Sequence, residues 1–150
     1  LAALVVTLGM TLGWQRFLMV QLPVTLLAGS LGVWLFYVQH QYEDTYWHRH
    51  DEWDFFDAAL QGSSFLVLPR PLQWITANIG LHHVHHLSSR IPNYKLQQVH
   101  DENPEFHVVT KVTLRDSWRL LTLSLWDEER RELIRFKDLK GLPASAGLFT

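Results

Sequence analysis

The sequence predicts an all-α membrane protein, in which a transmembrane helical hairpin with a truncated first helix is followed by a cytoplasmic or interfacial helical domain. Three observations lead to this prediction. Residues 17–38 form an uninterrupted, uncharged and mostly apolar run. Of the 13 Lys and Arg and the 15 Asp and Glu, only Arg16 lies in the first forty positions. All 9 histidines lie at position 40 or later, and the stretch HHVHH occupies residues 82–86.

The apolar run has the length of a membrane span. At about 1.5 Å rise per residue, a helix over residues 17–38 extends about 33 Å, which matches the roughly 30 Å hydrocarbon core of a bilayer. Residues 1–13 are apolar but too short to span alone. We therefore expect them to be the second half of an earlier helix, joined to the span by a tight turn at residues 14–16.

Two features of the chain predict its organisation and orientation. Leu1 is not an initiator, and the opening residues have neither a basic region nor a cleavage site, so we expect a C-terminal fragment. Nearly all basic residues follow the span, which predicts by the positive-inside rule that this part is cytoplasmic. The expected domains are residues 1–38, transmembrane helices with the first one truncated, and residues 39–150, a cytoplasmic His-rich domain with C-terminal amphipathic helices.

Composition excludes several function classes. The absence of cysteine excludes disulfides, thiolate zinc sites and thiol catalysis. Basic clusters interleaved with aromatic residues are also absent from the sequence, so nucleic acid is not an expected partner.

The region before the histidine cluster is apolar but interrupted. Residues 64–81 contain Pro69 and Pro71, and this predicts an interfacial or re-entrant segment rather than a second span. We expect the helix that carries the cluster to begin just after Pro71 and to end at the stretch IPNY, residues 91–94.

Helical spacing returns near the C-terminus. Leu114, Trp118, Leu121 and Leu125 recur at positions that share one helix face. The following stretch WDEERRELIRF is amphipathic with mixed charges. We expect a C-terminal helix that packs on the cytoplasmic domain, with contact to a membrane surface as the alternative.

The histidine cluster predicts a metal site. On a helix, His82, His85 and His86 stand at i, i+3 and i+4 and share a face, whereas His83 points about 100° away from His82. His83 could instead replace His82 as a ligand by pairing with His86 at i+3, and the sequence leaves this open. Imidazole ligands without thiolates suit iron, zinc, copper or nickel, and the surplus of histidines favours more than one ion. The alternative is a set of surface or hydrogen-bonded histidines.

Other histidines have less specific surroundings. His40 stands at the end of the predicted span and can lie over the same region as the cluster. His48 and His50 follow among several carboxylates, which we expect to be solvated or to orient ligating imidazoles. These carboxylates are Glu43, Asp44, Asp51, Glu52 and Asp54. We expect His100 and His107 to be ordinary surface residues.

The residues around the cluster resemble a known family. The stretch HHVHHLSSRIPNY resembles the third histidine box of membrane fatty acid desaturases, H-x-x-H-H followed by a turn with proline. The upstream stretches FYVQHQYED and DEWDF are similar to segments of the delta-12 (omega-6) acyl-lipid branch, including its bacterial members. There a Gln-His pair ends the last membrane helix, which corresponds to Gln39 and His40. The resemblance covers roughly residues 17–96.

The resemblance implies a function. Members of this family have four membrane helices and a cytoplasmic domain in which three histidine boxes bind two irons. The di-iron centre uses O2 to introduce a double bond into an acyl chain of a membrane lipid, with electrons from a donor such as ferredoxin or cytochrome b5. The resemblance implies His40, His82, His85 and His86 as metal ligands, no further catalytic residues, and a bacterial inner membrane.

The chain departs from the family pattern because the first two histidine boxes are absent from the 150 residues. We therefore expect the isolated piece to be inactive. A related di-iron hydroxylase, epoxygenase or carotenoid oxygenase shares the same chemistry and remains an alternative. A non-enzymatic membrane protein that binds or transports metal, and a purely structural membrane module, are the alternatives from other classes. Transporters, however, place ionisable ligands within their spans, and residues 17–38 contain none.

Overall fold

The computed structural model describes residues 1–141 of the chain. It divides into two compact units, Leu1–Phe36 and Tyr37–Thr150, which are considered separately below. The last nine residues of the predicted second domain lie outside the described part.

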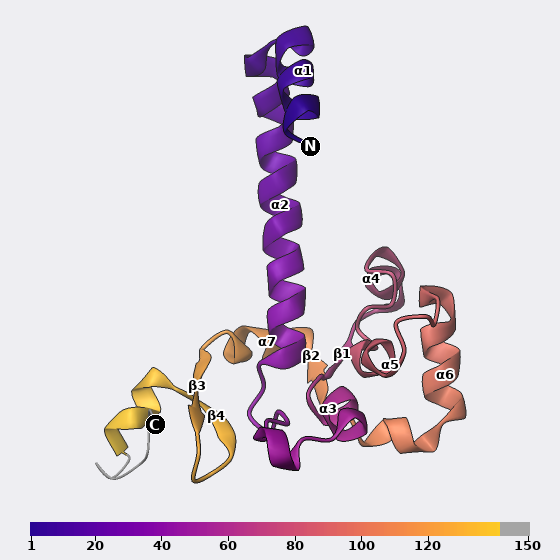
Figure 1. The fold of residues 1–150 in the computed structure, drawn as a ribbon, viewed down its shortest axis with the longest axis vertical. Helices are drawn as coiled ribbons and strands as arrows, with labels where there is room; N and C mark the ends of the chain where they lie inside the picture. The colour runs from indigo at the N-terminus through magenta and orange to yellow at the C-terminus, as the bar shows by residue number, and fades with distance from the viewer. Residues whose placement is uncertain (142–150) are drawn as a thin grey trace. The chain divides into compact units, whose positions relative to one another are not determined.

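The first unit is a pair of apolar helices. The short helix α1 (Ala2–Leu12) precedes the long helix α2 (Trp14–His40), whose last turn belongs to the second unit (Figure 1). Only Gly13 separates them, and its φ of 82° lies in the region that side chains disfavour, so the chain reverses there rather than at residues 14–16. Side chains of both helices line one shallow cavity, as a hairpin requires.

Helix α2 includes the predicted run at residues 17–38, so the expected long helix is confirmed. Its apolar side chains are largely exposed, Leu26 and Leu27 by 66% each. Within residues 1–141, α2 is the one helix long and apolar enough to cross a membrane, judged by length and composition. Pro23 lies inside it without ending it.

The second unit is built from short elements. Its helices are α3 (Phe55–Gln61), α4 (Arg70–Ile75), α5 (His82–Leu87), α6 (Leu96–Glu102) and α7 (Leu114–Leu120). Its strands are β1 (Phe65–Val67), β2 (Lys111–Thr113), β3 (Leu123–Asp127) and β4 (Glu132–Arg135). Its 3-10 turns are η1 (His50–Glu52), η2 (Asn93–Lys95), η3 (Pro104–Val108) and η4 (Phe136–Gly141).

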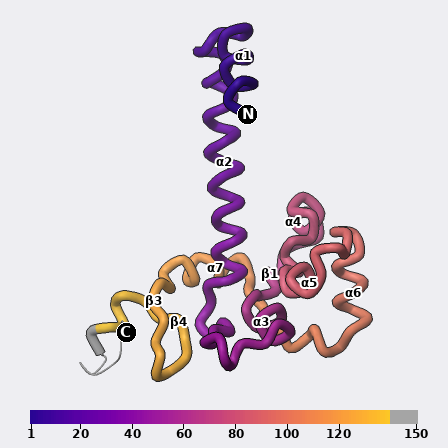
Figure 2. The backbone as a smooth tube through the Cα atoms, in the orientation of Figure 1, coloured from indigo at the N-terminus to yellow at the C-terminus, as the bar shows by residue number. Residues whose placement is uncertain are grey.

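The strands correct the all-α prediction: the protein is mostly helical but contains two small sheets. Strands β1 and β2 pair in parallel, with Leu66 opposite Val112. Strands β3 and β4 form an antiparallel hairpin, with Trp126 opposite Leu133. Figure 2 shows the backbone doubling back at this hairpin before the last described turn.

The predicted C-terminal helix is therefore wrong beyond Leu120. Leu125 lies in β3, and Trp118 on α7 is 70% exposed rather than packed on the domain. The turn of the hairpin is stabilised locally, because the Asp127 carboxylate accepts hydrogen bonds from the backbone N–H groups of Glu129 and Arg130. The hairpin buries Leu133 and Ile134, which a solvated charged helix would leave less covered.

The helix predicted to carry the histidine cluster from just after Pro71 to the stretch IPNY is instead divided in two, and its second part ends at Leu87. Helix α4 ends at Ile75, and α5 begins only at His82. Ala77 and Asn78 have φ of 55° and 56°, in the left-handed region, which interrupts a right-handed helix. The Asn78 side chain donates to the Asn93 carbonyl at 3.0 Å, so this break is tied to the turn after α5.

The core of the second unit lies behind α5. Its buried apolar residues are Phe65, Leu81, Val84, Leu96 and Val109, contributed by β1, the start of α5, α6 and the segment before β2. Figure 1 shows α5 beside α6 and β1, in agreement with their contacts. One face of α5 is therefore fixed against the core, and the opposite face remains for function.

Candidate metal centre

Helix α5 presents the histidine cluster in two directions. Val84 and His83 are fully buried on its core side. His82 is 9% exposed, and His86 is exposed at the other end of the same face. The i, i+4 spacing of these two residues brings their ring centroids to 4.5 Å, as the helical interpretation of the sequence predicts.

The last turn of α2 brings His40 to this face. The Gln39 side chain donates to the Ile79 carbonyl at 2.7 Å, and the Ser64 backbone N–H donates to the Gln39 carbonyl at 2.8 Å. Gln39 and Val38 are buried. These bonds join the end of α2 to the segments before β1 and α5, and so place the His40 ring against His82 and His86.

The three imidazoles converge on one point. The candidate ligand atoms of His40, His82 and His86 all lie within 4.8 Å of one another. The Nε2 atoms of His40 and His82 are 3.0 Å apart. Nitrogens bound to one metal at about 2.1 Å lie about 3 to 3.5 Å apart, so this pair already has the separation of two ligands on one ion.

The hydrogen bond at the back of His40 fixes which nitrogen can bind a metal. Its Nδ1 lies 3.0 Å from the Gly62 carbonyl oxygen. A carbonyl only accepts, so Nδ1 carries the proton and donates it. In a neutral ring Nε2 then keeps its lone pair and faces His82, which is the arrangement commonly found for metal-binding histidines.

Burial favours the neutral forms of His82 and His86. Desolvation, followed by the charges of His86 and His40, lowers the pKa of His82 to about 3. Burial, followed by His40 and His85, also lowers the pKa of His86. Metal ligands must be unprotonated, so the lowered pKa values of these rings favour metal binding at neutral pH.

One nitrogen of the cluster lacks a partner. His82 Nδ1 is buried without a hydrogen bond to any described residue. If Nε2 binds a metal, the proton of the neutral ring resides on this Nδ1. The three imidazoles therefore fit a bound metal ion. A hydrogen-bond acceptor for the proton on His82 Nδ1 would complete such a site.

The fourth predicted ligand, His85, lies next to this group but not in it. Its ring stacks on that of His82, with centroids 5.7 Å apart and an interplanar angle of 23°. The structure thus brings together three of the four predicted ligands and leaves His85 beside them.

His100 corrects another prediction, because it is buried rather than on the surface. It is 5% exposed, and its Nδ1 lies 3.0 Å from Nε2 of His83. His107 is exposed as expected, and its Nε2 donates to the His100 carbonyl at 2.8 Å. The spacing of Leu96, Val99 and His100 on one helix face was the available signal for this burial.

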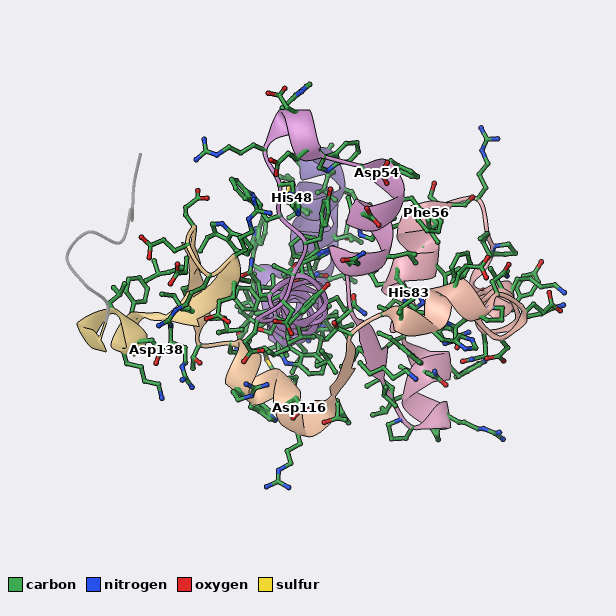
Figure 3. The ribbon with its side chains drawn as sticks, turned by 90° about the horizontal axis from the view of Figure 1, so that it is seen from below. His48, Asp54, Phe56, His83, Asp116 and Asp138 are labelled. Atoms are coloured by element: carbon green, nitrogen blue, oxygen red, sulfur yellow. The ribbon has the colours of Figure 1, made fainter. Side chains whose placement is uncertain are left out.

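The acidic segment after α2 lies outside the three-imidazole group. Its histidine His48 pairs with Glu52 at 3.2 Å, and Glu43 pairs with Arg119. Asp54 caps α3 by accepting from two backbone N–H groups (labelled in Figure 3). These carboxylates have structural partners of their own, so the structure does not support a role for them in orienting the ligands.

The chain is similar to known proteins in the part that contains these features. The family model for fatty acid desaturases matches residues 1–118. A fatty acid desaturase of Bacillus subtilis (strain 168) is 49% identical over 133 residues, which cover 89% of this chain. The chain spans 38% of the length of that relative. No solved structure matches the chain.

The matched region includes the end of α2, the break at residues 76–81 and the whole of α5, so it contains every residue of the three-imidazole group. The resemblance drawn from the histidine box and the two upstream stretches is thereby confirmed at the level of the family, and the chain belongs to the fatty acid desaturase family.

Proposed function

We propose that His40, His82 and His86 bind iron, and that the chain contributes this group to a membrane-bound, O2-dependent di-iron desaturase. The observation that supports the proposal most is the convergence of three imidazoles from two distant segments of the chain. His82 is buried between the other two rings, where desolvation disfavours its charged form, so the group differs from a chance set of solvated surface histidines.

The donor set narrows the choice of metal. Imidazole ligands suit iron, zinc, copper and nickel, and membership of the desaturase family favours iron among them. His85 lies where it could bind a second ion beside the first. Two irons require more ligands than these four imidazoles, so the complete centre would also include ligands from outside the described residues.

The proposed reaction introduces a double bond into the acyl chain of a membrane lipid. Bound iron would supply the activation of O2 that removing hydrogens from an unactivated CH2–CH2 pair requires. The residues of this chain hold the site in place: Gly62 orients the His40 ring, and Gln39 joins the end of α2 to the segment before α5. Reducing electrons would come from a donor protein such as ferredoxin or cytochrome b5.

The proposed location is a bacterial inner membrane. Helix α2 meets the length and composition of a span, and nearly all basic residues follow it. We therefore propose that α2 crosses the bilayer and that the second unit lies in the cytoplasm. An acyl chain would then reach the site from the membrane.

Metal binding by the purified chain in detergent micelles tests the site. Anaerobic titration with Fe²⁺, or with Co²⁺ as a spectroscopic probe, should show binding that His82→Ala and His86→Ala each weaken. Loss of a direct ligand should exceed the roughly tenfold to hundredfold effect of losing a group that hydrogen-bonds to a ligand. His50→Ala is the matched control, because this histidine is fully exposed and outside the group. Equal affinity in all four proteins would refute the ligand assignment.

Product analysis tests the reaction. Cells that express the chain, or a longer protein that contains it, are supplied with labelled saturated fatty acid, and their lipids are analysed by mass spectrometry. A new double bond supports the desaturase, whereas an added oxygen indicates the hydroxylase alternative. Double bonds formed by the 150-residue chain alone would show that the expectation of an inactive piece is wrong.

A further inference from the structure

A pair of histidines outside the metal-binding group joins α5 to α6. His83, labelled in Figure 3, is fully buried, and His100 on α6 is 5% exposed. Their ring nitrogens, Nε2 of His83 and Nδ1 of His100, are 3.0 Å apart. The Phe65 ring packs beside both, with centroids 6.0 Å from His83 and 5.3 Å from His100. Nothing in the proposed chemistry uses this pair.

The surroundings of the two rings indicate which of them donates this hydrogen bond. His83 Nδ1 is buried and has no hydrogen-bond partner among the described residues. If His100 were the donor, the neutral His83 ring would carry its proton on Nδ1, as a buried donor without an acceptor. A buried N–H without an acceptor is rarer in proteins than an unpaired acceptor, so we assign His83 Nε2–H as the donor and His100 Nδ1 as the acceptor. In this assignment the hydrogen bond runs from α5 to α6.

Helix α5 needs such a directional contact. It has six residues and packs against the core through apolar side chains such as Val84. Apolar contacts are non-directional and leave rotation about the helix axis weakly specified. A hydrogen bond depends steeply on its angle. Since His83 is one residue from His82, any rotation that breaks the His83–His100 bond also displaces the ligands.

We propose that the His83–His100 hydrogen bond fixes the rotation of α5 and so positions His82 and His86 for metal binding. His83 is a positioning residue and not a ligand. The inference rests on the proposed function, since it assigns a role with respect to the same site. The side chains of a functional site must lie within about 0.5 Å of their working positions. The contact between His83 and His100 holds α5 so that His82 and His86 meet this requirement.

Two substitutions of His83 separate this role from bulk stability. His83→Gln places an amide nitrogen near the position of Nε2 and keeps the donor, whereas His83→Asn is too short to reach His100. Co²⁺ affinity in detergent micelles should fall by about tenfold to hundredfold in His83→Asn, and His83→Gln should retain most of it. His100→Leu removes the acceptor from α6 and should reproduce the loss if His83→Asn fails to fold. Ile134→Ala, in the buried face of β4, is the control that lowers stability without touching α5.

Each outcome bears on the inference. Unchanged Co²⁺ affinity in both His83→Asn and His100→Leu would overturn it, and so would an equal loss in Ile134→Ala. If the unsubstituted chain binds no Co²⁺, the proposed function fails instead. The inference is then judged on the metal-free protein: cross-relaxation between the His40 and His82 rings should weaken in His83→Asn, and imidazole ¹⁵N shifts should place the His83 proton on Nε2. A proton on Nδ1 would overturn it.

Discussion

The buried histidines predict that the metal-free protein loses stability in mildly acidic solution. Burial, followed by the charge of His86, lowers the pKa of His82 to about 3, and burial, followed by the charge of His100, lowers that of His83 to about 3. In the unfolded chain both rings return to about 6.5. The unfolded state therefore binds more protons below pH 6.5, and stability falls as the pH falls through that value towards 3.

The size of the effect follows from these pKa values. At pH 5.5, one unit below the pKa of histidine in the unfolded chain, each buried ring lowers the free energy of unfolding by about 1.4 kcal/mol relative to pH 7.5 or above. His82 and His83 together should therefore lower the free energy of unfolding by about 3 kcal/mol. His86 and His100 also have lowered pKa values and act in the same direction. Carboxylates titrate mainly below pH 5, so they contribute little to this window.

Urea unfolding in detergent, followed by tryptophan fluorescence at pH 7.5, 6.5 and 5.5, measures this loss. His83→Gln is the informative variant, because it removes one titrating ring and keeps the hydrogen-bond donor. Its loss between pH 7.5 and 5.5 should be smaller than that of the unsubstituted chain by about 1.4 kcal/mol. A free energy of unfolding that stays constant within about 0.5 kcal/mol over this range would refute the reasoning, since it would mean that neither ring is buried uncharged.

Three further predictions concern local structure. Gly80→Ala should destabilise the second unit by about 1 to 3 kcal/mol, because the added Cβ would lie 2.4 Å from the Leu66 carbonyl oxygen. Gly29→Ala in α2 is its control: the added methyl meets no atom within 4 Å, so urea unfolding should show no loss. Thr113→Ala should cost about 1 kcal/mol, measured by the same unfolding assay, because it removes the capping box with Asp116 at the start of α7. Arg49→Ala should change the free energy of unfolding by less than about 1 kcal/mol, since its ion pair with Glu128 is exposed to solvent.

The features that the sequence predicts well depend on local periodicity. The run at residues 17–38 predicts one long helix because it lacks charge over its whole length, and α2 includes it. The i, i+4 spacing of His82 and His86 predicts a shared face because a single helical turn is enough to produce it. Neither inference requires knowledge of distant residues.

The features that the sequence does not predict depend on distant partners. The stretch from Trp126 onward contains good helix formers, yet it forms a hairpin because the Leu133 N–H donates to the Glu43 carbonyl and the Tyr37 hydroxyl donates to the Leu123 carbonyl. Strand β1 pairs with β2, which follows it by several helices. Local propensity favours a helix in the first case, and tertiary contacts override it.

The candidate site also combines features that the local sequence predicts with features that depend on distant contacts. His40 could be proposed from its position at the end of a helix, but its orientation depends on Gly62 and on the contact between Gln39 and Ile79. The burial of His100 depends on the packing of α6 on α5, which no pattern within the histidine box reveals. Sequence therefore identifies the ligand types, and packing decides which of them meet.

The number of metal ions that this chain binds by itself can be measured by titration. Nine histidines favour more than one ion, but His83 and His100 use their nitrogens on each other, and His107 donates to the His100 carbonyl. Of the other six, His40, His82 and His86 converge, His85 lies beside them, and His48 and His50 lie outside the group. One Co²⁺ per chain is therefore the expected stoichiometry in titration. Two tightly bound Co²⁺ ions would mean that His85 joins ligands that the metal-free arrangement keeps apart, and would place the second iron of the proposed centre within this chain.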